Sequence, residues 1–169
     1  MNKFLINNRI IRNIAGPSVI AMFFIGDRLL KLIAQNQGSI LSRPLIGHLL
    51  SFHYVPNPGI AFSIIINKTF LNISLSLIVL GLLFAIFYLI LKKNTEKCLL
   101  WPLTLILFGA ISNLTDRYLY GVVVDYFDLQ YFSIFNLADA MITAGVIIMI
   151  LKIYIYTPPK KKLKKWMKK

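Results

Sequence analysis

The stretch LNISLSLIVLGLLFAIFYLIL, residues 71–91, decides the class of fold. Its only clearly polar residues are Asn72, Ser74 and Ser76, all in its first two turns. A bilayer span requires about 20 consecutive, mostly apolar residues. The stretch therefore predicts a transmembrane helix.

The composition of the whole chain supports this interpretation. The 169 residues are 57% hydrophobic and 15% charged, with a net charge of +13. A soluble domain usually carries about 25% charged residues, and a disordered chain has low hydrophobicity. A soluble nucleic-acid-binding protein would explain the basic charge but not the abundance of Leu, Ile and Phe. The composition therefore predicts an integral membrane protein.

Three further apolar stretches can be matched to spans, at about residues 14–34, 99–115 and 135–155. The first of them is the weakest prediction because it contains Asp27, Arg28 and Lys31. We expect a single integral membrane domain over residues 1–169, folded as an all-α bundle of four transmembrane helices.

The distribution of charge predicts the orientation. Lysines and arginines gather before the first span, after the second span, and at Lys152 and in the tail at residues 156–169, and these three groups carry the whole net charge. On the opposite side the basic residues are balanced by aspartates. The positive-inside rule then places both termini in the cytoplasm. The basic tail is interpreted as a contact with anionic membrane lipids rather than with nucleic acid.

The loop between the first two spans is long enough to fold. It covers about residues 35–70, and residues 48–55 have the composition of a β-strand. This run ends at Pro56-Asn57-Pro58-Gly59, a dense turn signal. We expect a small β-containing substructure on the outer face.

Several polar residues lie where a membrane protein rarely places them, and such residues are functional candidates. Asp27 and Lys31 are four residues apart and can neutralise one another on one helical face. Asn113, Asp116 and Arg117 also share one face, and Asp116 is expected to pair with Arg117.

Asp125 and Asp139 remain as carboxylates without an evident partner, while Asn136 is a candidate helix cap. Two carboxylates that meet share a proton, so that one can activate a water while the other polarises a carbonyl. This aspartyl-protease chemistry needs no metal and no cofactor. The rival hypotheses are a small ion- or proton-translocating protein that uses Asp27, Asp125 and Asp139, and a non-catalytic scaffold.

A metal site is not expected. The chain has one cysteine, Cys98, and its two histidines, His48 and His53, match no zinc-binding spacing.

Five blocks resemble the motifs of the bacterial lipoprotein signal peptidases. These enzymes, also called signal peptidase II, are membrane aspartyl proteases. In chain order they are Asp27-Arg-Leu-Leu-Lys31, Asn57-Pro-Gly-Ile-Ala-Phe62, Gly109-Ala-Ile-Ser-Asn-Leu-Thr-Asp-Arg117, Gly121-Val-Val-Val-Asp-Tyr126 and Phe135-Asn-Leu-Ala-Asp139. Two positions at the third block are often glycine in the family. Here they are Phe108, just before the block, and Ser112, within it.

The resemblance implies roles for these residues. Asp125 and Asp139 would form the catalytic dyad. The residues that bind or orient the substrate would be Asn57, Gly59, Asn113, Arg117 and Asn136. The supporting residues would be Asp27, Lys31 and Asp116.

The resemblance also implies the reaction and its location. The substrate would be a diacylglyceryl-modified prolipoprotein, cut just before the lipidated cysteine at the outer surface of the bacterial cytoplasmic membrane. The partners would be that substrate and membrane lipids, with no metal and no nucleic acid, and globomycin-type antibiotics would inhibit the enzyme.

Overall fold

Four helices and a small sheet make up the part of the chain that the computed structural model describes, residues 3–37, 43–59, 67–91 and 99–156. The elements in chain order are α1 (Lys3–Gln37), β1 (Arg43–Ile46), β2 (Leu50–Asn57), α2 (Lys68–Leu91), α3 (Leu100–Leu119), β3 (Val123–Leu129), β4 (Ser133–Phe135) and α4 (Leu137–Tyr156). Residues 60–62, which complete the Asn57–Phe62 block, and the tail from residue 157 onward lie outside this part.

The helices agree with the four apolar stretches, and most of their boundaries lie within three residues of the predictions, but two differ by more. Helix α1 begins eleven residues before residue 14 and is about 52 Å long at 1.5 Å per residue. Helix α3 continues four residues beyond residue 115. The predictions stopped where the apolar character stopped, whereas Lys and Arg are good helix formers and allow the backbone ladder to continue.

Two of the described helices are long and apolar enough to cross a bilayer by themselves, α2 and residues 137–155 of α4. The outer face of α2 exposes large apolar side chains, including Leu77 at 63% and Phe84 at 71% of their surface. An apolar surface of this kind is stable in lipid and not in water. The chain is therefore a membrane protein.

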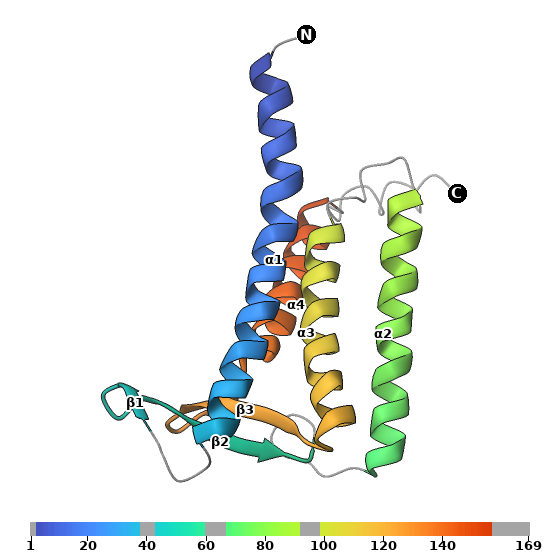
Figure 1. Cartoon of the computed structure of the whole chain (residues 1–169). Coiled ribbons are helices and arrows are strands. Elements are labelled where there is room, and N and C mark those ends of the chain that lie inside the picture. The colour runs from blue at the N-terminus through green and yellow to red at the C-terminus, as the bar shows by residue number, and fades with distance from the viewer. Residues whose placement is uncertain (1–2, 38–42, 60–66, 92–98, 157–169) are drawn as a thin grey trace, which may run out of the picture.

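Helix α3 lies at the centre of the helical layer and contacts α1, α2 and α4 (Figure 1). Two glycines allow its close approach to α4. A Cβ at Gly109 would lie 2.6 Å from the backbone oxygen of Ala138, and a Cβ at Gly145 would lie 2.6 Å from Ile106. Small residues at such crossings are typical of helix packing in membranes.

The sheet joins two segments that are distant in the sequence. Its strands are antiparallel in the order β1-β2-β3-β4. The predicted strand at residues 48–55 is confirmed as β2, but it is shifted by two residues, so Pro56 and Asn57 belong to the strand and not to the turn. The sheet lies at the end of the helices that is farthest from the start of α1 (Figure 1).

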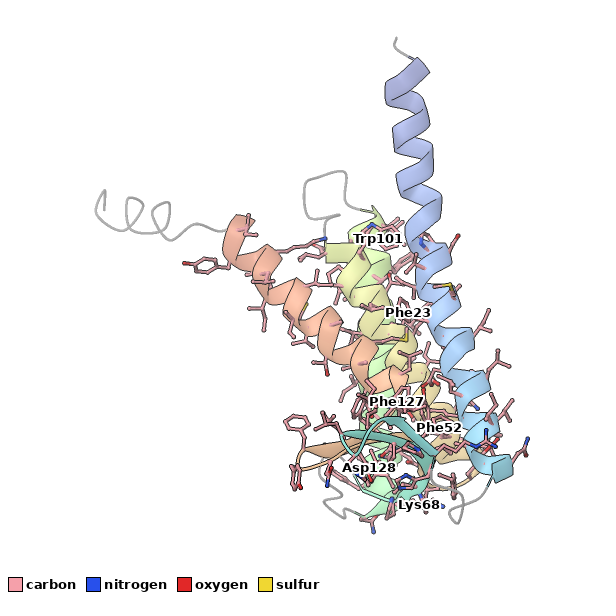
Figure 2. The ribbon with its side chains drawn as sticks, turned by 90° about the vertical axis from the view of Figure 1, so that its left-hand side faces the viewer. Phe23, Phe52, Lys68, Trp101, Phe127 and Asp128 are labelled. Carbon is pink, nitrogen blue, oxygen red and sulfur yellow. The ribbon has the colours of Figure 1, made fainter. Side chains whose placement is uncertain are left out.

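The two faces of β3 have different surroundings because side chains alternate along a strand. Val124 and Tyr126 are buried with Phe52 of β2 and Ala34 of α1 in a small core. Phe52 and Phe127 lie at this end of the molecule, and Trp101 lies at the opposite end of the helices (Figure 2). Asp125 has its side chain on the other face of β3.

Candidate active site

Asp125 is held by two asparagine side chains. Its Oδ2 accepts a 3.0 Å hydrogen bond from Nδ2 of Asn57, and its Oδ1 accepts one of 2.6 Å from Nδ2 of Asn136. Val55 of β2 pairs with Asp125, so Asn57, two residues further along, lies on the same face of the sheet. The carboxylate is 2% exposed. Burial raises the pKa of Asp125 to about 6, and the nearby charge of Asp139 adds to this effect, while the hydrogen bonds from the two asparagines oppose it.

Asp139 lies in the first turn of α4 and is fixed by a reciprocal cap. Oδ1 of Asn136 accepts the backbone N–H of Asp139 at 2.9 Å, and Oδ2 of Asp139 accepts the backbone N–H of Asn136 at 3.3 Å. This exchange is a capping box in which Asn136 is the cap and Asp139 the third helical residue. The prediction of Asn136 as a helix cap is confirmed.

Asn136 therefore connects the two carboxylates that the sequence singled out. Its amide nitrogen binds Asp125 and its amide oxygen binds the backbone of Asp139. Between Asp125 and Asp139 the chain forms the antiparallel hairpin of β3 and β4, which reverses its direction. As a result, both carboxylates line one cavity.

A second chain of polar contacts reaches Asp139 from α1. Nδ2 of Asn113 donates to Oδ1 of Asp139 at 2.7 Å, and Oδ1 of Asn113 accepts from Nζ of Lys31 at 2.8 Å. Lys31 is buried and also pairs with Asp27 at 3.1 Å, as the four-residue spacing predicted. Asn113 thus lies between a buried cation and Asp139.

The predicted pairing of Asp116 with Arg117 is wrong. Asp116 instead pairs with Arg28 at 2.5 Å and with Lys31 at 2.7 Å, both on α1, and accepts the N–H of Val124 at 3.2 Å. Neighbouring residues on a helix point about 100° apart. Asp116 therefore faces α1, whereas Arg117 turns toward the cavity.

Arg117 contacts the turn after β2. Its guanidinium donates to the backbone oxygen of Gly59, and the N–H of Gly59 donates to Oδ1 of Asn57 at 3.0 Å. Nε of Arg117 is buried without a hydrogen-bond partner among the described residues. Arg117 is one of the residues that line the cavity.

The cavity has a volume of about 400 Å³ and combines a polar end with apolar walls. The polar end carries Asn57, Asn113, Arg117, Asp125 and Asp139. The walls come mainly from helices α2, α3 and α4, with residues such as Leu75, Ile78, Leu114 and Ile142. No three His, Cys, Asp or Glu side chains converge as metal ligands within the described part of the chain.

Three contacts around the site were not predicted. Arg28 binds Asp116, and the hydroxyls of Ser112 and Tyr126 donate to Asp27 at 2.6 and 2.9 Å. Of these three residues, only the placement of Tyr126 could be expected from the sequence, because alternation along a strand puts its side chain on the opposite face from Asp125. Ser112 and Arg28 depend on how α1 packs against α3.

The fold is that of a membrane enzyme. A bacterial membrane enzyme solved by the in meso method at 2.3 Å resolution superposes with a TM-score of 0.72 and 28% sequence identity, over 86% of this chain and 91% of that one. A second such structure, at 1.9 Å resolution, gives a TM-score of 0.68 with 29% identity, over 82% of this chain and 92% of that one.

Proteins of similar sequence show which family of membrane enzymes this is. A lipoprotein signal peptidase of Clostridium tetani is 38% identical over 79% of this chain and 88% of its own length. The lipoprotein signal peptidase of Streptococcus agalactiae is 34% identical over 85% of this chain and 94% of its own length. The family model described as signal peptidase (SPase) II matches residues 19–155. The chain belongs to the signal peptidase II family.

Proposed function

We propose that this chain is an aspartic endopeptidase that removes the signal peptide from diacylglyceryl-modified prolipoproteins, cutting just before the lipidated cysteine. The observation that carries the proposal is the link through Asn136, which holds Asp125 and Asp139 on one cavity. Family membership supports the proteolytic reaction and the lipoprotein substrate class.

The chemistry follows from a shared proton. At such a pair one carboxyl stays protonated and the other is ionised, because two adjacent buried charges are costly. The ionised carboxylate takes a proton from water while the water oxygen bonds to the scissile carbonyl carbon, and the protonated carboxyl gives its proton to the carbonyl oxygen. The carboxyl that took the water proton then gives it to the leaving nitrogen as the C–N bond breaks. The other carboxylate takes a proton from a hydroxyl of the diol, which restores the pair to its starting state with one proton.

The cavity suits a substrate that is part peptide and part lipid. The guanidinium of Arg117, which lines the cavity, would donate to a backbone carbonyl of the substrate. Asn57 would hold Asp125 in place, and the backbone oxygen of Gly59 would hold Arg117. The apolar walls from α2 and α4 would receive apolar side chains and the acyl chains near the cysteine. Globomycin-type inhibitors would occupy the same cavity.

The protein would cross the bacterial cytoplasmic membrane four times. Helices α1 and α3 would join α2 and α4 as spans, because their charged residues are paired with one another inside the bundle. The positive-inside rule would then place both termini in the cytoplasm and the sheet, with the dyad, near the outer surface. Membrane lipids would contact the exposed apolar faces.

The rival hypothesis, ion or proton translocation, requires a polar path that continues past the dyad. A second cavity, of about 430 Å³, lies between helices α1, α3 and α4. It is lined by apolar residues such as Val19, Phe23 and Leu105, with Lys152 as its one charged residue. Carboxylates confined to one end support a one-sided site.

The experiment is replacement of each aspartate in cells depleted of their own enzyme. Asp125→Asn and Asp139→Asn should each abolish processing and cause diacylated prolipoprotein to accumulate, while both variants remain inserted. Asp128→Asn is the matched control, because Asp128 lies on the same strand but its side chain is partly exposed and pairs with His53, at 3.8 Å. Full processing by either dyad variant would contradict the proposal.

A further inference from the structure

The N-terminus of α4 is capped by three side chains, one from β3, one from α1 and that of Asn136, the residue just before the helix. The first N–H groups of a helix lack partners within the helix. Here the N–H of Leu137 donates to the hydroxyl of Tyr126 at 2.9 Å, and the N–H of Ala138 donates to Oδ1 of Asp27 at 3.1 Å. The N–H of Asp139 donates to Asn136, as described above.

Tyr126 and Asp27 are also bound to each other. The hydroxyl of Tyr126 donates to Oδ1 of Asp27 at 2.9 Å, and both side chains are fully buried. Burial, reinforced by the negative charge of Asp27, raises the pKa of Tyr126, so the hydroxyl keeps its proton and acts as the donor. One hydroxyl thus joins the sheet, helix α1 and the first turn of α4.

We infer that Tyr126 is a positioning residue for Asp139: its hydroxyl fixes the first turn of α4 so that the Asp139 carboxylate meets Asp125. The inference rests on the proposed function, because it assigns catalysis to that pair. Strand alternation explains how one segment does both tasks, since Asp125 points into the cavity and Tyr126 points to the opposite face, toward α1.

The position of this contact explains why its loss should affect chemistry rather than binding. Tyr126 does not line the cavity, whereas Asp139, two residues after Leu137, does. Small displacements of a reacting group can lower turnover by factors of ten to a hundred. A shift of the first turn of α4 would change the geometry of the carboxylate pair and leave the substrate-binding walls in place.

The test is Tyr126→Phe, which removes only the hydroxyl, assayed on a diacylated prolipoprotein substrate with purified, monodisperse full-length protein. We expect kcat to fall about tenfold with KM unchanged, and the amide of Leu137 to lose protection in hydrogen exchange. Tyr118→Phe is the control, because that hydroxyl contacts the hydroxyl of Ser76 at an exposed site, and its kcat should match wild type.

A second variant separates positioning from simple loss of stability. Ser112→Ala removes the other buried hydroxyl that donates to Asp27, and within the described part of the chain the side-chain bonds of Ser112 go to α1 and not to α4. It should lower the thermal midpoint about as much as Tyr126→Phe and lower kcat several-fold less. Equal kcat losses at equal midpoints, or a wild-type kcat for Tyr126→Phe, would overturn the inference. If Asp139→Asn stayed active in the same assay, the proposed function itself would fail.

Discussion

Lys31 of α1 and Asp116 of α3 form a buried ion pair, with 2.7 Å between Nζ and Oδ2. Lys31 also pairs with Asp27, so one ammonium group serves two carboxylates inside the protein. Isolated charges cannot be buried at low cost, and this pair of contacts allows α1 to pack against α3.

Lys31→Met should therefore destabilise the protein strongly. Removing one partner from a buried ion pair costs about 3–5 kcal/mol, because the remaining charge stays buried without compensation. Thermal unfolding in detergent would measure the effect. Arg28→Met is the matched control, since Arg28 binds the same carboxylate but its side chain is partly exposed. A midpoint for Lys31→Met equal to that of Arg28→Met would contradict the central role of Lys31.

Asn136→Ala should lower activity far more than the loss of a helix cap explains. The variant removes both the cap on Asp139 and the hydrogen bond to Asp125, and we expect kcat to fall roughly 100-fold. Asn67→Ala is the control: Asn67 caps α2 through a 3.1 Å bond to the N–H of Phe70, away from the cavity. Loss of that cap should cost about 1 kcal/mol of stability with little change in kcat. Similar kcat values for the two variants would refute the linking role of Asn136.

Gly109→Ala should separate α3 from the start of α4. The added Cβ would lie 2.6 Å from the backbone oxygen of Ala138, so the helices must move apart. Overpacking of this kind costs about 1–3 kcal/mol, and the shift should also reduce activity because Ala138 precedes Asp139. Gly81→Ala provides the comparison, since a Cβ there meets nothing within 4 Å. Midpoints measured side by side should fall for Gly109→Ala only.

The pH dependence of stability should reveal the raised pKa of Asp125. Its pKa of about 6 lies above the ordinary value of 3.8 for an aspartate, so the folded state holds the proton more tightly than the unfolded chain. The free energy of unfolding should then decrease as the pH rises from about 4 to about 6, by about 3 kcal/mol in total. The Asp125→Asn variant should lack this component. Parallel stability curves for wild type and variant over that range would show that the pKa of Asp125 is not raised.

Activity should not depend on a metal ion. The proposed pair activates water through a shared proton, which requires only the two carboxyl groups. Purified enzyme treated with EDTA and then dialysed should cleave a diacylated substrate at its original rate. A loss of activity that zinc or magnesium restores would contradict the mechanism.

Much of the candidate site was predictable because its local spacing carries geometric information. Asp27 and Lys31 pair across one helical turn, and Asn136 caps the helix that contains Asp139 three residues later. Such contacts lie within one element, where the backbone period alone decides which side chains meet.

The partners of Asp116 and Arg117 could not be predicted in this way. Adjacent opposite charges suggested a pair, yet Asp116 binds α1 and Arg117 binds the turn at Gly59. Their partners come from distant segments, which only the packing of α1 and β2 against α3 brings near.

Composition and local periodicity were enough to predict the membrane class, the apolar stretches that became helices, the strand that precedes Gly59 and the two aspartates of interest. The packing of distant segments was needed to show that Asn136 bridges Asp125 and Asp139, that Lys31 reaches Asp139 through Asn113, and that the hydroxyl of Tyr126 caps α4. These contacts join elements whose relative placement is set by the burial of apolar surface and by the need of every buried polar group for a partner.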